Sequence, residues 1–180
     1  MGQLHDSKAK RTICTHEPQL ATLTVCRFAQ DQHNTGLLGT NGFVGGGIGL
    51  ATGAALAARL KGTDGVAVSF FGDGASSHQT FHECLNLAQS LKAPVVFVCE
   101  NNLYATATPL RKVTENPDIA SRGAAYGMRA VAVDGNDVVA VALAAHTAVQ
   151  AARNGLGPTL IEARTYRIQG HHTNDPGADP

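Results

Sequence analysis

From residue 36 onward, the sequence alternates short apolar runs with segments in which apolar residues recur every three or four positions. The apolar runs predict four strands, at residues 66–71, 95–99, 128–133 and 159–165. The periodic segments between them predict helices. Continuous apolar runs are typical of parallel strands that are covered on both faces. The pattern therefore predicts an α/β domain, a parallel sheet with helices on both faces.

Three stretches carry the helical pattern. The glycine-rich segment LLGTNGFVGGGIGLATGAALAARL, residues 37–60, passes from a loop into a helix whose small side chains allow close packing. Residues 78–91 predict a second helix, and its apolar positions at helical spacing predict the buried face: Phe81, Leu85, Ala88 and Leu91. Either Asn136 or Asp137 caps a third, alanine-rich helix that ends near Gly155.

The two ends of the chain do not share this alternation. Residues 1–35 are polar and mixed in charge, so they predict an irregular or weakly ordered arm. The stretch GHHTNDPGADP at the other end has turn composition throughout. We therefore expect an N-terminal arm over 1–35, an α/β core over 36–167 and the start of a loop over 168–180.

Composition and charge narrow the possible functions. The 180 residues carry 14 basic and 14 acidic side chains, so the sequence has no electrostatic footprint for nucleic acid or an anionic membrane. No apolar run approaches the roughly 20 residues of a membrane helix. The N-terminus MGQLHDSKAKR lacks the apolar core of a signal peptide. The four cysteines show no paired metal spacing, which indicates reduced thiols. We expect a cytoplasmic protein.

Polar residues follow two of the predicted strands. Gly72-Asp73-Gly74 comes after the strand at 66–71, and Asn101-Asn102 comes after the strand at 95–99. In open parallel sheets, ligands bind in the crevice at the carboxyl ends of the strands. Asp73 and Asn102 therefore meet in one crevice if the two strands are neighbours. Their carboxylate and amide oxygens are ligands that suit Mg²⁺ or Ca²⁺.

Two side chains do not complete the shell of Mg²⁺, which commonly takes further ligands from water and phosphate oxygens. A diphosphate is the natural missing partner, because the glycines let the backbone approach it. The N–H groups of Gly74 and Ala75, at a helix start, can face its oxygens. Simpler interpretations stay open at this point. Gly-Asp-Gly is a common turn, Asp73 can cap a helix, and an Asn pair after a strand is usually a turn.

Gly72-Asp73-Gly74, followed after 26 residues by Asn101-Asn102, resembles the thiamine-diphosphate motif of enzymes that use this cofactor. The segments LGTNGFVGGGI, FHECLNLA, PVVFVCENNLYA and TYRIQGHHTNDPG are similar to the alpha subunit of the 2-oxo acid dehydrogenases. This is the pyruvate, branched-chain and acetoin dehydrogenase group. The resemblance covers about residues 36–177 and implies the thiamine-diphosphate-binding fold.

The resemblance also implies which residues bind the cofactor and its metal ion. It assigns Asp73, the Asn102 side chain and the Tyr104 backbone carbonyl to Mg²⁺. It assigns Gly74 and Ala75 to the diphosphate of thiamine diphosphate.

Three further residues are implied by the same resemblance. The carbonyl of Gly42 and the N–H of Val44 fall on the positions that contact the aminopyrimidine. His171 matches the active-site loop histidine that lies close to the cofactor and assists transfer to the lipoyl group.

The implied activity is oxidative decarboxylation of a 2-oxo acid with acyl transfer to a lipoyl group. The implied partners are a beta subunit, in an α2β2 assembly with the cofactor between the chains, and the lipoyl domain of a dihydrolipoyl acyltransferase. In the family the beta subunit supplies the glutamate that activates the aminopyrimidine. We therefore expect this chain to be inactive alone.

The sequence also departs from the family. Family members are nearly twice this length, and residues 1–35 lack the Tyr-Arg pair that grips the diphosphate there. A noncatalytic or degenerate fragment that keeps the fold and its subunit contacts is therefore an alternative function. A transketolase-like enzyme is another, since it also uses Gly-Asp-Gly and Asn, although ENNLY and GHHTNDPG argue against it. The sequence does not identify the 2-oxo acid.

Overall fold

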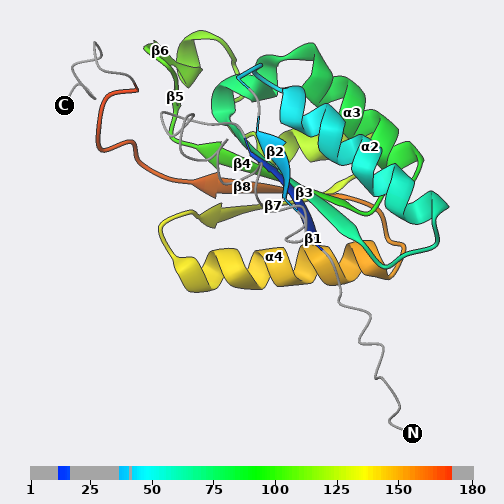
Figure 1. Ribbon diagram of the computed structural model, residues 1–180. Coiled ribbons are helices and arrows are strands. Elements are labelled where there is room, and N and C mark those ends of the chain that lie inside the picture. Colours follow the sequence, from blue (N-terminus) through cyan, green and yellow to red (C-terminus); the bar gives the residue numbers. More distant parts are fainter. Residues whose placement is uncertain (1–11, 17–36, 41, 172–180) are drawn as a thin grey trace, which may run out of the picture.

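The computed structural model describes residues 12–16, 37–40 and 42–171, with one parallel sheet at the centre (Figure 1). Six strands run in the order β2-β1-β3-β4-β8-β7, and every neighbouring pair is parallel. Their bounds are β1 Thr12–His16, β2 Leu37–Thr40, β3 Val66–Gly72, β4 Val95–Asn101, β7 Arg129–Asp134 and β8 Thr159–Arg164. A separate antiparallel pair follows β4 and consists of β5 (Tyr104–Ala105) and β6 (Thr108–Pro109). The predicted parallel α/β sheet is confirmed.

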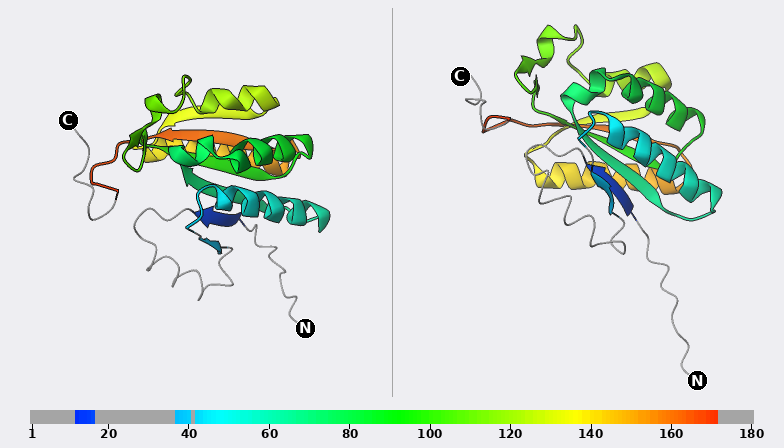
Figure 2. Two further views of the ribbon diagram at one scale, coloured as in Figure 1. Left: turned by 90° about the horizontal axis from the view of Figure 1, so that it is seen from above. Right: turned by 45° about the horizontal axis from the view of Figure 1, so that its top comes forward.

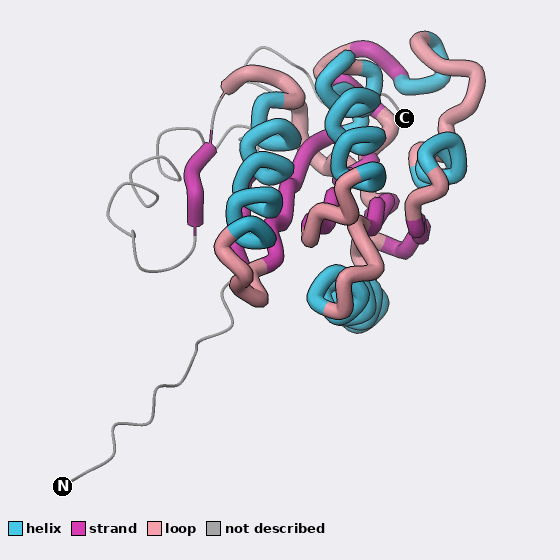
Figure 3. Tube along the Cα trace, turned by 90° about the vertical axis from the view of Figure 1, so that its right-hand side faces the viewer, coloured by secondary structure: helices cyan, strands magenta, loops and turns pink. Residues whose placement is uncertain are grey.

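Helices cover both faces of this sheet, as the sequence predicts (Figures 1, 2 and 3). Helices α2 (Gly46–Leu60) and α3 (Gln79–Ser90) lie side by side on one face, and α4 (Val138–Arg153) lies on the other. Three 3₁₀ helices complete the described chain: η1 (Asp73–Ser77), η2 (Leu110–Lys112) and η3 (Ala120–Tyr126).

The central strands are apolar on both faces because each face supports a core. Phe71 and Phe97 pack in the core under α2 and α3. Val68, Val98 and Ile161 pack in a second core under α4. Successive residues of a strand point to opposite faces, so a strand between two helical layers needs apolar residues at nearly every position. This explains the continuous apolar runs in the sequence.

The structure differs from the sequence prediction in three places. Residues 12–16, in the arm expected to be irregular, form β1 between β2 and β3. Residues 37–40, expected in a loop, form the edge strand β2. Both strands are short, and pairing with β3 or β1 supplies a context that their own pattern does not reveal. The rest of the arm, residues 1–11 and 17–35, and the end of the loop, residues 172–180, lie outside the described residues.

The third difference concerns a helix end. Phe81, Leu85 and Ala88 are buried as predicted, but Leu91 is 43% exposed. Helix α3 ends at Ser90, so Leu91 follows the helix and leaves the buried face. At α4 the predicted cap is confirmed, because the Asp137 carboxylate accepts the N–H groups of Val139 and Ala140.

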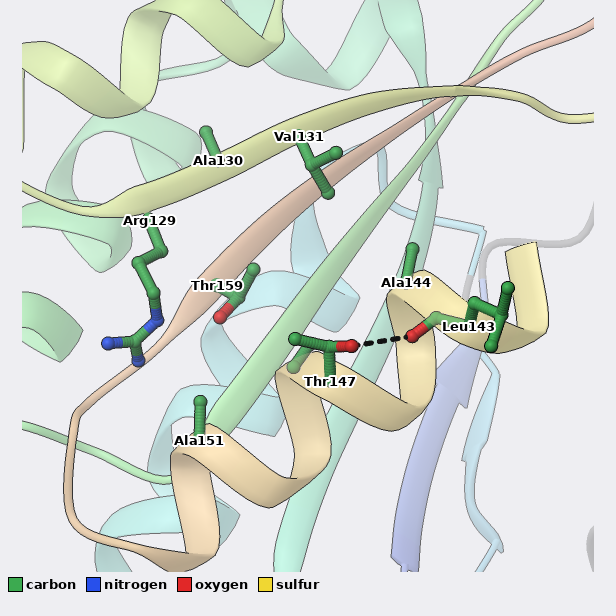
Figure 4. A pocket seen from close by; sticks show the side chains of 9 residues that line it. Arg129, Ala130, Val131, Leu143, Ala144, Thr147, Ala151 and Thr159 are labelled. Atoms are coloured by element: carbon green, nitrogen blue, oxygen red, sulfur yellow. Dashed lines mark hydrogen bonds between the residues drawn. The ribbon is translucent and has the colours of Figure 1, made fainter. Parts of the chain in front are cut away.

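An apolar groove lies between the edge strand β7 and helix α4 (Figure 4). It encloses about 470 Å³ and is lined by alanine, valine and leucine side chains together with Arg129, Thr147 and Thr159. Arg129 and Thr159 are the first residues of β7 and β8, so the groove lies toward the amino ends of the strands. Within the described ranges, no helix combines the length and apolar character needed to cross a membrane.

Candidate functional site

Asp73 stands where β3 ends and η1 begins, at the carboxyl edge of the sheet. Its side chain is almost completely buried, with 1% exposed, yet neither carboxylate oxygen has a hydrogen-bond partner among the described residues. Burial raises the pKa of the Asp73 carboxyl. The backbone N–H groups of Asp73, Asn102 and Tyr104 and the Arg167 guanidinium oppose this rise from nearby, but none of them completes a hydrogen bond to the carboxylate. A buried carboxylate without a partner is costly, which points to a ligand at this position.

Asn102 lies beside Asp73, as the sequence predicts. Strands β3 and β4 are parallel neighbours, with Gly72 paired to Glu100, so the turns that follow the two strands meet at the same edge. Asn102 is buried, and its Oδ1 accepts the N–H of Tyr104 at 3.0 Å. The N–H groups of both residues act on the Asp73 carboxylate. The structure thus brings Asp73, Asn102 and Tyr104 together.

Gly74 and Ala75 follow Asp73 in η1. A Cβ atom on Gly74 would lie only 2.8 Å from the Cβ of Ala105 in β5, so this close approach requires glycine. The predicted helix start after β3 is a 3₁₀ helix, and α3 begins only at Gln79. Backbone N–H groups here therefore lie on a tight turn next to Asp73.

Gly42 and Val44 lie in the loop that connects β2 to α2. Val44 is exposed, and the ring of Phe43 between them packs edge-on against His78, with 5.3 Å between ring centroids. His78 caps the N-terminus of α3, where its ring accepts the N–H of Thr80. This contact places the loop beside the start of α3. Contact of Gly42 and Val44 with a cofactor remains a prediction.

His171 is the last described residue and is half-buried, in the segment that follows β8. The same segment carries Arg167, which the sequence analysis did not single out. The Arg167 guanidinium lies over the ring of Tyr104, 5.4 Å from its centroid, and donates to the carbonyl of Thr106 at 2.6 Å. It also lowers the pKa of Asp73. The catalytic role of His171 remains a prediction.

Arg122 is a second arginine that the sequence analysis missed. Its Nη1 donates to the carbonyl of Ser76 at 2.8 Å and to the Ser76 hydroxyl at 3.0 Å, which joins η3 to η1. Neither arginine stands in a recognisable pattern: Arg122 lies among small residues in ASRGAAYG, and Arg167 lies in the segment TYRIQGHH. A diphosphate needs positively charged partners. The predicted diphosphate site was therefore the one reason to look for nearby arginines.

The donor set at this edge does not form a complete metal cage. Among the described residues, no three His, Cys, Asp or Glu side chains gather as a metal site. One carboxylate, one amide oxygen and backbone carbonyls are hard ligands, and Mg²⁺ commonly binds to such partial sets together with water and phosphate oxygens. The residues present therefore fit a Mg²⁺–diphosphate pair better than an isolated ion.

Comparison with known proteins places this chain in a family. The model of the dehydrogenase E1 component family matches residues 14–179. The alpha subunit of acetoin:2,6-dichlorophenolindophenol oxidoreductase from Bacillus subtilis (strain 168) is 55% identical over 140 residues, covering 78% of this chain and 42% of that protein. The chloroplastic pyruvate dehydrogenase E1 component subunit alpha-3 of Oryza sativa subsp. japonica is 46% identical over 155 residues, covering 81% and 36%.

Solved structures agree on the fold. A putative thiamin diphosphate-dependent enzyme from Mycobacterium smegmatis superposes with a TM-score of 0.62 at 25% identity, over 88% of this chain and 29% of that one. A transketolase from Pichia stipitis gives 0.59 at 26% identity, over 73% and 21%. The chain spans about two fifths of the length of the curated relatives it matches. The family match extends over most of its residues, and the chain belongs to the dehydrogenase E1 component family.

Proposed function

We propose that this chain is the cofactor-binding part of the alpha subunit of a 2-oxo acid dehydrogenase that uses thiamine diphosphate and Mg²⁺. The observation that carries the proposal is the buried Asp73 carboxylate, which has no hydrogen-bond partner among the described residues and lies beside Asn102. A divalent cation would compensate both the buried charge and its unpaired oxygens. The 55% identity to an acetoin oxidoreductase subunit, against 26% to a transketolase, favours the dehydrogenase over the transketolase-like alternative.

In this proposal Asp73, the Asn102 Oδ1 atom and the Tyr104 carbonyl hold Mg²⁺. The N–H groups of Gly74 and Ala75 bind the diphosphate, and the close packing of Gly74 on Ala105 leaves no room for a side chain that would displace them.

The remaining contacts follow the same assignment. The Gly42 carbonyl and the Val44 N–H orient the aminopyrimidine, and His171 lies near the reacting end. When bound, thiamine diphosphate supplies the electron sink for decarboxylation of the 2-oxo acid. This chain binds the diphosphate end, orients the ring and offers the His171 imidazole for the acyl transfer to a lipoyl group.

The partner in this proposal is a beta subunit, in an α2β2 assembly that also receives the lipoyl domain of an acyltransferase. Five large side chains on the loops at the carboxyl edge of the sheet are exposed and apolar or aromatic, and we call them the apolar rim. They are Phe43, Val44, Leu103, Tyr166 and Ile168. Exposed apolar side chains on the loops around a candidate site support the presence of a protein partner.

Isothermal titration of thiamine diphosphate and Mg²⁺ into the chain, with the beta subunit present, tests the proposal. Asp73→Asn removes the charge without changing the shape, and we expect it to weaken binding by more than about 100-fold. Asp64→Asn is the matched control. Asp64 is exposed in the loop before β3, at the amino ends of the strands, whereas Asp73 lies at their carboxyl ends. Unchanged binding in Asp73→Asn, or no binding by the unaltered pair of subunits, would rule out the assignment.

A second candidate function is a noncatalytic subunit that keeps the fold and the subunit contacts. The absence from residues 1–35 of the Tyr-Arg pair that grips the diphosphate in the family motivates it. Size-exclusion chromatography with the beta subunit, followed by a decarboxylation assay, separates the two candidates. A stable complex without turnover favours the noncatalytic subunit, and a stable complex that releases CO₂ from a 2-oxo acid favours the enzyme.

A further inference from the structure

A second buried carboxylate, Glu162, lies in the middle of β8, between β4 and β7. It is completely buried, with 0% exposed, at a position flanked by Ile161 and Ala163. Burying a charge inside a sheet costs free energy, so its presence is weak evidence for a contribution to stability. Its hydrogen bonds indicate a different use.

Both carboxylate oxygens of Glu162 bind groups from other elements. Oε1 accepts the Asn101 side-chain amide at 2.7 Å and the Arg164 Nε–H at 3.2 Å. Oε2 accepts the backbone N–H of Ala120, at the start of η3, at 2.8 Å. Glu162 thus connects the end of β4 with η3, and each connection leads on toward the candidate cation site.

The first connection determines the turn that carries Asn102. Because Asn101 donates its Nδ2 to Glu162, its Oδ1 faces the other way and accepts the N–H of Leu103 at 2.9 Å. Leu103 has φ of +70°, a conformation that L-residues rarely adopt. Asn102 then repeats the pattern with the N–H of Tyr104. Two overlapping turns therefore set the direction of the Asn102 oxygen and the Tyr104 carbonyl.

The second connection leads to the turn that carries Asp73. Ala120 and Arg122 belong to the same 3₁₀ helix, η3. Arg122 donates to the carbonyl and hydroxyl oxygens of Ser76, and the Ser76 hydroxyl in turn donates to the Asp73 carbonyl at 2.6 Å. The Glu162 carboxylate therefore lies between the two turns that present the proposed cation ligands.

We propose that Glu162 is a positioning residue, which fixes the Asn101 amide and thereby holds the Asn102–Tyr104 turn in the conformation that binds the cation. The importance of the turn for metal binding rests on the proposed function, whereas the positioning itself is a property of the chain without any ligand. Groups that orient metal ligands commonly change metal affinity by about 10–100-fold when they are removed.

The test uses Glu162→Gln in the full 180-residue chain. Glutamine offers one acceptor where three donors converge. Its amide nitrogen faces Asn101 when its oxygen accepts Ala120, and slow exchange of the Ala120 amide identifies this orientation. The Asn101 amide then turns over, and the N–H of Leu103 loses its acceptor. By amide hydrogen exchange measured with NMR, we expect the Leu103 amide to exchange about fivefold to tenfold faster. Glu83→Gln, an exposed carboxylate on α3, is the control that leaves this exchange unchanged.

A swapped pair distinguishes positioning from general support of the fold. In the double variant Asn101→Asp with Glu162→Gln, the glutamine amide donates to the new aspartate, whose other oxygen still accepts Leu103. The glutamine oxygen still accepts Ala120. We expect this pair to restore slow exchange at Leu103, whereas Asn101→Asp alone places two carboxylates face to face and does not.

Unchanged exchange at Leu103 in a folded Glu162→Gln variant whose Ala120 amide still exchanges slowly would overturn the inference, as would a swapped pair that stays unprotected at Leu103. If the Ala120 amide exchanges fast, or if Glu162→Gln does not fold, the swapped pair decides in the same way. Mn²⁺ titration in the presence of thiamine diphosphate and the beta subunit, followed by electron paramagnetic resonance, supplies the link to binding. There we expect about tenfold weaker Mn²⁺ binding in Glu162→Gln. Failure of the unaltered chain to bind Mn²⁺ would count against the proposed function while the exchange result stands.

Discussion

Asp73 is a single residue whose burial costs free energy of folding when no ligand is bound. Its carboxylate is buried without a hydrogen-bond partner among the described residues, and burial raises its pKa. A raised carboxyl pKa means that the ionised form is less favourable in the folded chain than in the unfolded chain. Ionisation of Asp73 therefore lowers the free energy of unfolding at pH values above its ordinary pKa, as long as no cation is bound.

Asp73→Asn should consequently stabilise the chain when no metal is present. At neutral pH we expect its Tm to rise by about 2–4 °C, which corresponds to about 1 kcal/mol for a chain of this size. Calorimetry measures this, with Asp64→Asn as the control that leaves Tm unchanged. With the beta subunit present, addition of Mg²⁺ and thiamine diphosphate should then raise the Tm of the complex formed by the unaltered chain more than that of the complex formed by Asp73→Asn. A lower Tm for the metal-free variant would contradict the burial argument.

Gly74 in η1 is closely packed, whereas Gly53 in α2 is exposed. In η1, a Cβ on Gly74 would meet the Cβ of Ala105 at 2.8 Å, whereas a Cβ on Gly53 in α2 would meet nothing within 4 Å. The two glycines therefore have different reasons to be glycine. Gly74 allows η1 and β5 to approach each other, and Gly53 carries only the entropic cost of a glycine inside a helix.

This contrast predicts opposite outcomes for the same substitution. Gly53→Ala should raise the free energy of unfolding of the isolated chain by about 0.5–1 kcal/mol. Gly74→Ala should lower it by about 1–3 kcal/mol, because the added methyl group forces η1 and β5 apart. Urea denaturation of both variants measures the two changes. Equal effects of the two substitutions would show that η1 and β5 are not in close contact.

The sequence allowed the prediction of elements that have a pattern of their own. Strands β3 and β4 are covered on both faces, so their continuous apolar runs were sufficient to predict them as strands. The residues that follow the two strands, Asp73 and Asn102, could then be predicted to lie together if the strands were neighbours. Strand β1 has no such pattern, because its five residues depend on pairing with β3. The roles of Arg122, Arg167 and Glu162 come from contacts between segments distant in sequence, which no local pattern encodes.

At the scale of the whole molecule, the two ends of the sheet are different. The carboxyl edge gathers Asp73, Asn102, Arg167 and the apolar rim. The groove between β7 and α4 lies toward the amino ends of the strands (Figure 4). Parallel topology produces this division, because every β-to-α loop is at the carboxyl edge. A partner subunit that shares the cofactor is therefore expected to cover the apolar rim and to leave the opposite edge free.

Two exposed apolar side chains test this arrangement. Ile168, in the apolar rim, is 84% exposed, and Leu60, at the C-terminal end of α2 near the amino ends of the strands, is 88% exposed. Because both are exposed in the isolated chain, serine at either position should change its Tm little. Ile168→Ser should weaken association with the beta subunit by about tenfold, since an apolar contact at an interface is lost. Leu60→Ser should leave association unchanged. Analytical ultracentrifugation of the mixed subunits measures both, and stronger weakening by Leu60→Ser would place the partner at the other end of the sheet.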